Sequence, residues 1–329
     1  MAILTDGRKM ETFMKSRKYL LLGAVAALGL TLAGCASSAE PAAPETAPEA
    51  VEVTPEIEQI RKLIPAEIAA KGFLNVGYQN TAGLPYGEID ENGKDRGLSV
   101  DLANTLGGVL GLEVRGKGVD FATLIPGLQA GRYDLVTNIT TDKPDRREVV
   151  DYVDVMFGEP SSLVVQADSP LKGTGLADAC GLTIGVDTGS SQEEQVNTQS
   201  DACVAAGEKK ITVQAFQGIP DMLLSLKSGR SDAVFLSMGA SRYTASQDDT
   251  LALSKTGNEL VELNGILTPQ GNGMKEAVRA AMLYLVGNGE WEKMLAKYGL
   301  EDLAPTEEVV NNDNADYTAL LEAAQAERQ

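Results

Sequence analysis

The sequence contains no histidine. That absence removes the residue most often used as a general base, together with the Ser-His-Asp arrangement and most zinc sites. Basic residues are also few, because 28 lysines and arginines stand against 47 acidic residues and leave a net charge of −19 at pH 7. Nucleic-acid binding needs clustered cations that neutralise phosphates, so nucleic acid is not expected as a partner. We assign no catalytic residue and no metal site, and an enzyme is the less favoured class.

Cysteine is rare too, with three in the chain, and the first of them, Cys35, ends the sequence Leu-Ala-Gly-Cys. Lys15, Arg17 and Lys18 precede an uncharged apolar run over residues 19–34. This run is shorter than the roughly 20 apolar residues of a membrane-spanning helix and fits a cleaved signal. Leu-Ala-Gly-Cys resembles the bacterial lipobox, which predicts a lipoprotein signal peptide over residues 1–35 and an extracytoplasmic protein anchored to the bacterial cell membrane by lipid at Cys35. The alternative is an ordinary secretory signal with a chance cysteine.

Two segments outside the expected folded body have biased compositions. Residues 36–55 are nearly all Ala, Pro, Glu, Ser, Thr and Val, which cannot bury enough apolar area to fold, and we expect a disordered spacer there. Residues 304–329 form an acidic C-terminal tail. The remaining cysteines, Cys180 and Cys203, are expected to form a disulfide in an oxidising compartment, with two buried free thiols as the alternative.

Hydrophobic periodicity predicts helices and strands in alternation. In the first half we expect helices over residues 57–70, 97–110 and 121–131 and strands over 74–77, 112–115 and 134–137. In the second half we expect strands over 182–186, 211–214 and 233–236 and helices from 191 and over 220–228, 274–286 and 290–298. Strand-helix-strand order favours parallel sheets with right-handed crossovers. The chain is therefore predicted to form two α/β lobes, and the last two helices must pack on one of them.

Ligands of open α/β sheets bind at the carboxyl ends of the strands, so the segments that follow the strands are the candidate site. The segment 138–147 is expected to be a loop rich in hydroxyls and amides, and its Arg146 offers a planar fork that matches a carboxylate. An arginine in a loop is also commonly a solvated surface residue. In the second lobe, Ser190 and Ser191 follow Gly189 before a helix, where they suit either an anion or a simple N-cap.

The order of several short segments resembles the family of extracellular solute-binding proteins of polar amino-acid ABC transporters, family 3. The segments are residues 72–77, 97–102, 121–128, 131–134, 145–152, 179–186, 228–234 and 289–299, together with Cys203. The resemblance implies an α/β, two-lobed periplasmic-binding-protein-like (Venus flytrap) fold with two crossover hinge strands. Lobe 1 would comprise residues 56–158 and 265–303, and lobe 2 with the hinges residues 159–264.

By resemblance, the protein captures an amino acid or a related small carboxylated solute between its lobes and delivers it to an ABC permease. No cofactor is expected, and the protein is expected to be a monomer. Arg146 matches the residue that grips the ligand carboxylate. The other residues implied to contact the ligand are Thr140, Thr141, Ser190, Ser191 and Phe121, the last against the apolar part.

One departure from the family pattern concerns the ligand's α-ammonium. The Asp that holds this group in amino-acid receptors is replaced here by Ser237. A buried ammonium needs a carboxylate partner, so either Glu88, Asp120 or Asp187 supplies one or the ligand has no α-amine. Tyr86 is interpreted as a core residue.

Two other classes of function are open on the same fold. The resemblance extends to cyclohexadienyl dehydratases, which would need an acid or base in the cleft, and a sensor subunit would report the ligand to a separate membrane partner. For a solute receptor, we expect Arg146→Ala to weaken binding strongly and the neighbouring Arg147→Ala to weaken it little.

Overall fold

A computed structural model describes residues 52–256 and 262–311. The predicted signal peptide with Cys35, most of the spacer and most of the acidic tail lie outside the described residues. Within the described part, no helix is both long enough and apolar enough to cross a membrane.

The first sheet combines parallel and antiparallel strands in the order β4-β1-β5-β12-β6. Its strands are β1 (Phe73–Tyr78), β4 (Glu113–Gly118), β5 (Leu135–Thr141), β6 (Val150–Phe157) and β12 (Leu263–Pro269). β1 runs parallel to β4 and β5, whereas β12 runs antiparallel to β5 and β6. A short hairpin, β2 (Glu88–Ile89) and β3 (Asp95–Arg96), precedes α3. The parallel strands place several of their carboxyl ends along one edge of the sheet.

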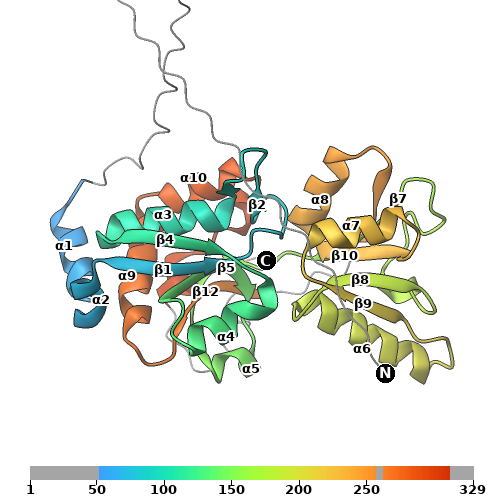
Figure 1. The fold of residues 1–329 in the computed structure, drawn as a ribbon, viewed down its shortest axis with the longest axis horizontal. Coiled ribbons are helices and arrows are strands. Elements are labelled where there is room, and N and C mark those ends of the chain that lie inside the picture. The colour runs from blue at the N-terminus through green and yellow to red at the C-terminus, as the bar shows by residue number, and fades with distance from the viewer. Residues whose placement is uncertain (1–51, 257–261, 312–329) are drawn as a thin grey trace, which may run out of the picture. The chain divides into compact units, whose positions relative to one another are not determined.

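Helices cover both faces of this sheet, and Figure 1 shows α3 on one side and α4 on the other. The helices of this half are α1 (Pro55–Lys62), α2 (Ala66–Lys71), α3 (Leu98–Leu110), the 3₁₀ turn η1 (Phe121–Thr123), α4 (Leu124–Gln129), α5 (Pro144–Arg147), α9 (Met274–Gly287), α10 (Glu290–Lys297), η3 (Glu301–Leu303) and α11 (Glu307–Asn311). The apolar faces of α3, α9 and α10 form one core with β1 and β6. Leu124 and Leu128 of α4 form a second core with Val150 and Tyr152 of β6. Successive side chains of a strand point to opposite faces of the sheet, so the two cores lie on opposite faces.

The second sheet has the order β11-β7-β10-β8-β9. Its strands are β7 (Ser161–Gln166), β8 (Thr183–Asp187), β9 (Thr212–Phe216), β10 (Ala233–Ser237) and β11 (Leu251–Thr256), and its helices are η2 (Leu176–Asp178), α6 (Ser191–Ala205), α7 (Ile219–Lys227) and α8 (Met238–Gln247). β8 is parallel to β9 and β10, and β7 is antiparallel to β10 and β11. Cys180 and Cys203 form a disulfide with their Cα atoms 5.6 Å apart, as predicted.

The chain passes between the two sheets twice. β6 of the first sheet is followed after residues 158–160 by β7 of the second, and β12 of the first sheet follows β11 of the second. The two links come close together at Gly158 and Glu262, where the Gly158 N–H donates to the Glu262 carbonyl at 2.6 Å. A Cβ at Gly158 would lie only 2.9 Å from that oxygen. After β12 the chain stays with the first sheet, where the Trp291 indole N–H donates to the Val155 carbonyl at 2.7 Å. The last two predicted helices therefore pack on the first lobe.

Two sequence-based expectations about local structure are wrong. The helix expected over residues 57–70 is divided into α1 and α2, because Pro65 has no N–H for a helical hydrogen bond and disfavours helix at the preceding residue. The segment 138–147 is not a loop, since β5 continues to Thr141 and Pro144 begins the short helix α5. The second difference places Thr140, Thr141 and Arg146 on regular backbone. Helix α8 and strands β6, β7, β11 and β12 were not assigned as elements from the sequence.

Candidate functional site

A pocket lies between the two sheets, lined from both of them and from both links. The first lobe contributes Gln79, Tyr86, Phe121, residues 138–141 and Arg146, the second Asp187, residues 190–192 and Ser237, and the links Glu159 and Glu262. The space measures about 830 Å³, including the part open to solvent. Gln79 follows β1, Asp187 ends β8 and Ser237 ends β10, so these lining residues lie at carboxyl ends of strands, where open α/β sheets bind ligands.

Arg146 provides the positive charge of the pocket and joins the two lobes. Its guanidinium donates to the Thr141 carbonyl at 2.9 Å and to the Gly189 carbonyl at 3.0 Å. It also lies 5.6 Å from the centre of the Phe121 ring. These contacts fix the orientation of the guanidinium, and a guanidinium held in this way presents a planar pair of donors suited to a carboxylate.

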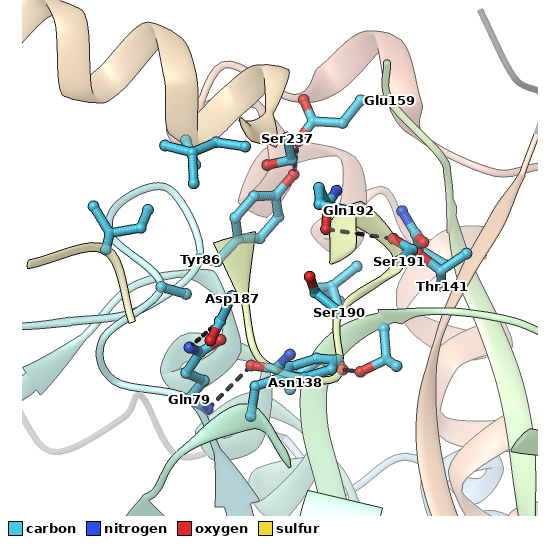
Figure 2. Close-up of a pocket in the computed structure, with 18 of the residues that line it drawn as sticks. Gln79, Tyr86, Asn138, Thr141, Glu159, Asp187, Ser190, Ser191, Gln192 and Ser237 are labelled. Carbon is cyan, nitrogen blue, oxygen red and sulfur yellow. Dashed lines mark hydrogen bonds between the residues drawn. The ribbon is translucent and has the colours of Figure 1, made fainter. Parts of the chain in front are cut away.

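Hydroxyl groups from the two lobes meet beside Arg146. The Thr141 and Ser191 hydroxyl oxygens lie 3.2 Å apart, and Ser191 is buried (Figure 2). The Ser190 hydroxyl accepts from the Glu193 N–H at 3.1 Å and is therefore the N-cap of α6. Ser190 both caps the helix and lines the pocket, so the two sequence interpretations of this residue are compatible.

Asp187 is a carboxylate with little compensation for its burial. Its Oδ2 accepts from the Gln79 side-chain amide at 2.5 Å, whereas its Oδ1 is buried with no hydrogen-bond partner among the described residues. Burial raises the pKa of Asp187 to about 6. A carboxylate in such a position lowers its free energy by binding a cation.

Glu159 and Glu262 extend from the links and add acidic groups to the same pocket. The Tyr86 hydroxyl and the Gly239 N–H donate to the Glu159 carboxylate, the latter at 2.7 Å. Burial raises the pKa of both Glu159 and Glu262. The pocket therefore combines one guanidinium with three carboxylates.

Comparison with known families identifies the chain. The model of the bacterial extracellular solute-binding proteins, family 3, matches residues 74–301. The chain belongs to this family.

Among curated relatives of this solute-binding protein is the arginine-binding protein ArgT of Corynebacterium glutamicum, which is 27% identical over 290 residues, covering 87% of this chain and 93% of the relative. Among solved structures, an ancestral arginine-binding protein bound to arginine is 29% identical, with a TM-score of 0.62 and coverage of 69% of this chain and 98% of that one. An ancestral amino acid-binding protein described as a precursor of cyclohexadienyl dehydratase, 23% identical over 70% of this chain and 97% of its own with a TM-score of 0.62, shows the fold alone. The predicted two-lobed α/β fold is confirmed.

The solute-binding protein brings most of the predicted site residues into one pocket. Those that line it are Arg146, Thr140, Thr141, Phe121, Ser190, Ser191 and Ser237. Thr140 lines the pocket, and its hydroxyl already donates to the Asn138 carbonyl at 2.9 Å. These residues come from β5, η1, α5 and β10 and from the N-terminus of α6.

Glu88 and Asp120 are not part of this pocket. Glu88 lies in β2, forms an ion pair with Arg96 across the hairpin, and lines a separate surface pocket with Tyr243. The candidate assignment of Glu88 to the ligand site is therefore corrected, because its side chain pairs with Arg96 in the hairpin and does not line the pocket between the sheets. Asp120 is exposed at the N-terminus of η1. Of the three acids considered from the sequence, only Asp187 lines the pocket.

Gln79, Glu159 and Glu262 were not predicted from the sequence, and Tyr86 was predicted only as a core residue. Gln79 directly follows β1, so the rule that ligands bind after strands would have found it. Tyr86 packs partly on the first core, as expected, but it also lines the pocket. The two glutamates lie in the links between the sheets, and no local sequence pattern marks that position.

Arg147 is not the neutral comparison for Arg146 that the sequence suggested. It forms an ion pair with the fully buried Asp142 and lies 3.2 Å from the Asp154 carboxylate. Burial and the neighbouring Asp142 raise the pKa of Asp154 well above its ordinary value. Removing Arg147 would leave these two buried acids without the guanidinium that contacts both of them. An exposed arginine is therefore the better control.

Proposed function

We propose that this protein is the extracytoplasmic receptor of an ABC importer and that it binds a basic amino acid such as arginine in the pocket between its sheets. The observation that carries the proposal is the charge pattern of the pocket, in which the fixed guanidinium of Arg146 is accompanied by Asp187, Glu159 and Glu262. An α-amino acid with a cationic side chain carries one carboxylate and two cations. The pocket offers a partner for each of these groups.

The carboxylate of the ligand would bind at Arg146. The guanidinium is already oriented by two carbonyls, and the Thr141 and Ser191 hydroxyls lie beside each other at the same corner. Hydroxyls and the N-terminus of α6 add donors for an anion, and the helix dipole favours negative charge there. The Phe121 ring, whose centre lies 5.6 Å from the guanidinium, adds an apolar surface to this corner.

The cationic side chain of the ligand would bind at Asp187. The unpartnered Oδ1 of Asp187 needs a donor, and Gln79 fixes the other oxygen. A guanidinium carries several N–H donors in one plane and is suited to such a carboxylate. The similarity to arginine-binding proteins supports this choice of ligand.

Isothermal titration calorimetry with L-arginine tests the proposal, with L-glutamine and L-glutamate as the neutral and acidic comparisons. Arg146→Ala should reduce the affinity by about 2 to 5 kcal/mol, because it leaves a desolvated carboxylate without its partner. Arg132→Ala, which removes an exposed arginine of the same lobe, should change the affinity little. Equal effects of the two substitutions would refute the assignment of Arg146, and the absence of any heat with arginine would refute the choice of ligand.

Delivery to a permease and attachment to the membrane form the second part of the proposal. The Leu-Ala-Gly-Cys sequence before the spacer supports lipidation of Cys35, which would keep the receptor beside its transporter. In the bacterium that makes the protein, Cys35→Ser should move the protein from the membrane fraction to the medium and lower arginine uptake. Retention of the variant in the membrane fraction would argue against the anchor.

An enzyme on the same fold is the second candidate, and the pKa of Asp187 near 6 is the observation that favours it. A carboxyl group with such a pKa is suited to general acid and base catalysis near neutral pH. Dehydration of a cyclohexadienyl substrate by the purified protein would establish this function. Calorimetric binding of arginine without turnover favours the receptor.

A further inference from the structure

Glu159 reaches the pocket from the link between β6 and β7. Its carboxylate accepts from the Gly239 N–H at 2.7 Å and from the Tyr86 hydroxyl, and the Ser237 hydroxyl is a further hydrogen-bond partner. Figure 2 shows Glu159, Ser237 and Tyr86 gathered at one end of the pocket and Asp187 with Gln79 at the other. Glu159 is therefore a second acidic position, separate from Asp187.

The donors to Glu159 within the described part of the chain are neutral. The phenol, the hydroxyl and the backbone amide orient the carboxylate. The positive charge of Arg242 lowers the pKa of Glu159 only weakly. Burial raises the pKa of Glu159. An oriented carboxylate that is removed from water and bound only by neutral donors is stabilised further when a cation binds to it.

The corner that holds Glu159 is connected to the corner that holds Arg146 through a short chain of neighbouring residues. Ser161 is the ladder partner of Ser237 in the pairing of β7 with β10, and the Gln192 side-chain amide donates to the Ser161 hydroxyl at 3.1 Å. Gln192 follows Ser191, whose hydroxyl lies 3.2 Å from that of Thr141 beside Arg146. In an α-amino acid the ammonium is separated from the carboxylate by a single carbon, whereas a side-chain cation lies several bonds away.

We infer that Glu159 binds the α-ammonium of the ligand, with Ser237 and Tyr86 as its positioning partners. The inference rests on the proposed function. The carboxylate that an ammonium requires is absent at Ser237, at the end of β10, and Glu159 supplies it from the neighbouring link. Because residues 158–160 connect the two sheets, the ligand's amine would bind to the connection between the lobes, and the receptor would discriminate amino acids from acids that lack an α-amine.

Calorimetry with two ligands tests this assignment. L-arginine carries the α-amine, and α-desamino-arginine is the same acid without it. Glu159→Gln keeps the shape of the side chain and removes its charge, so it should weaken L-arginine binding about 30-fold or more and change the binding of the desamino compound by only about threefold. Glu88→Gln makes the same chemical change outside the pocket and should alter neither affinity.

A second variant separates a binding role from a structural one. Adding Ser237→Asp to Glu159→Gln places a carboxylate on the neighbouring residue and should restore much of the L-arginine affinity. Equal weakening of both ligands by Glu159→Gln without rescue by Ser237→Asp would overturn the inference, because it would show that Glu159 only holds Tyr86 and Gly239 in place. An unchanged affinity of Glu159→Gln for L-arginine would overturn it as well. If the unmutated protein does not bind L-arginine, the proposed function fails and the inference fails with it.

Discussion

The Asp187→Asn substitution should raise the stability of the unliganded protein while weakening the binding of arginine. Burial raises the pKa of Asp187 from 3.8 to about 6, so ionising this carboxyl group is less favourable in the folded protein than in the unfolded chain. Because one unit of pKa corresponds to 1.36 kcal/mol, the ionised form costs about 3 kcal/mol of folding free energy at pH 7. Asparagine carries no charge and removes most of this cost.

The effect depends on pH in a defined direction. Between about pH 4 and pH 6 the folded protein retains a proton on Asp187 that the unfolded chain has already released. The contribution of this proton to stability is complete below about pH 4 and is lost as the pH rises through about 6. The gain from Asp187→Asn should therefore be largest at neutral pH and close to zero near pH 4.

Differential scanning calorimetry without ligand measures the gain directly. For a protein of this size, 1 kcal/mol shifts the melting temperature by roughly 2 to 4 °C, so Asp187→Asn should melt about 5 °C or more above the unmutated protein at pH 7. Asp201→Asn, an exposed aspartate of α6, is the matched control. The same variant should bind arginine about 30-fold or more weakly, because the guanidinium loses its charged partner. A melting temperature that does not rise at pH 7, or that rises equally at pH 4, would refute the reasoning.

Two further predictions concern stability away from the ligand. Arg147→Ala should lower the free energy of unfolding by about 3 kcal/mol or more in urea titrations, because Asp142 and Asp154 would stay buried without the guanidinium that contacts both. A loss below about 1 kcal/mol would show that the contacts of Arg147 with these two acids are dispensable for stability. Reduction of the Cys180–Cys203 disulfide should lower the free energy of unfolding by roughly 3 kcal/mol and leave arginine affinity unchanged, since neither cysteine lines the pocket; an unchanged melting temperature under reductant would contradict this.

The sequence predicted the part of the site that depends on the order of elements. Arg146 and Ser191 lie in segments that follow predicted strands, the family resemblance added Thr141 and Ser237, and all four line one pocket. The strand rule has a simple physical basis, because parallel strands with crossover helices bring their carboxyl ends to one edge. Hydrophobic periodicity is a local property, so it is readable along the chain.

The parts that the sequence did not reveal depend on contacts between distant segments. Glu159 faces the pocket because β6 and β7 pair in different sheets and the link between them passes Tyr86 and Gly239. Glu88 is an acid at a plausible position in the sequence, yet its pairing with Arg96 in a hairpin carries it elsewhere. Neither outcome follows from local composition.

The sequence by itself determined the alternating α/β architecture, the absence of histidine chemistry and the candidate carboxylate site at Arg146. Each of these follows from residue types, from their spacing, or from their position after a strand. Only the tertiary structure decided which acids line the pocket and which arginine supports the core. That decision rests on burial, because the pairing and pKa of a charged group are set by neighbours that the fold brings from far along the chain.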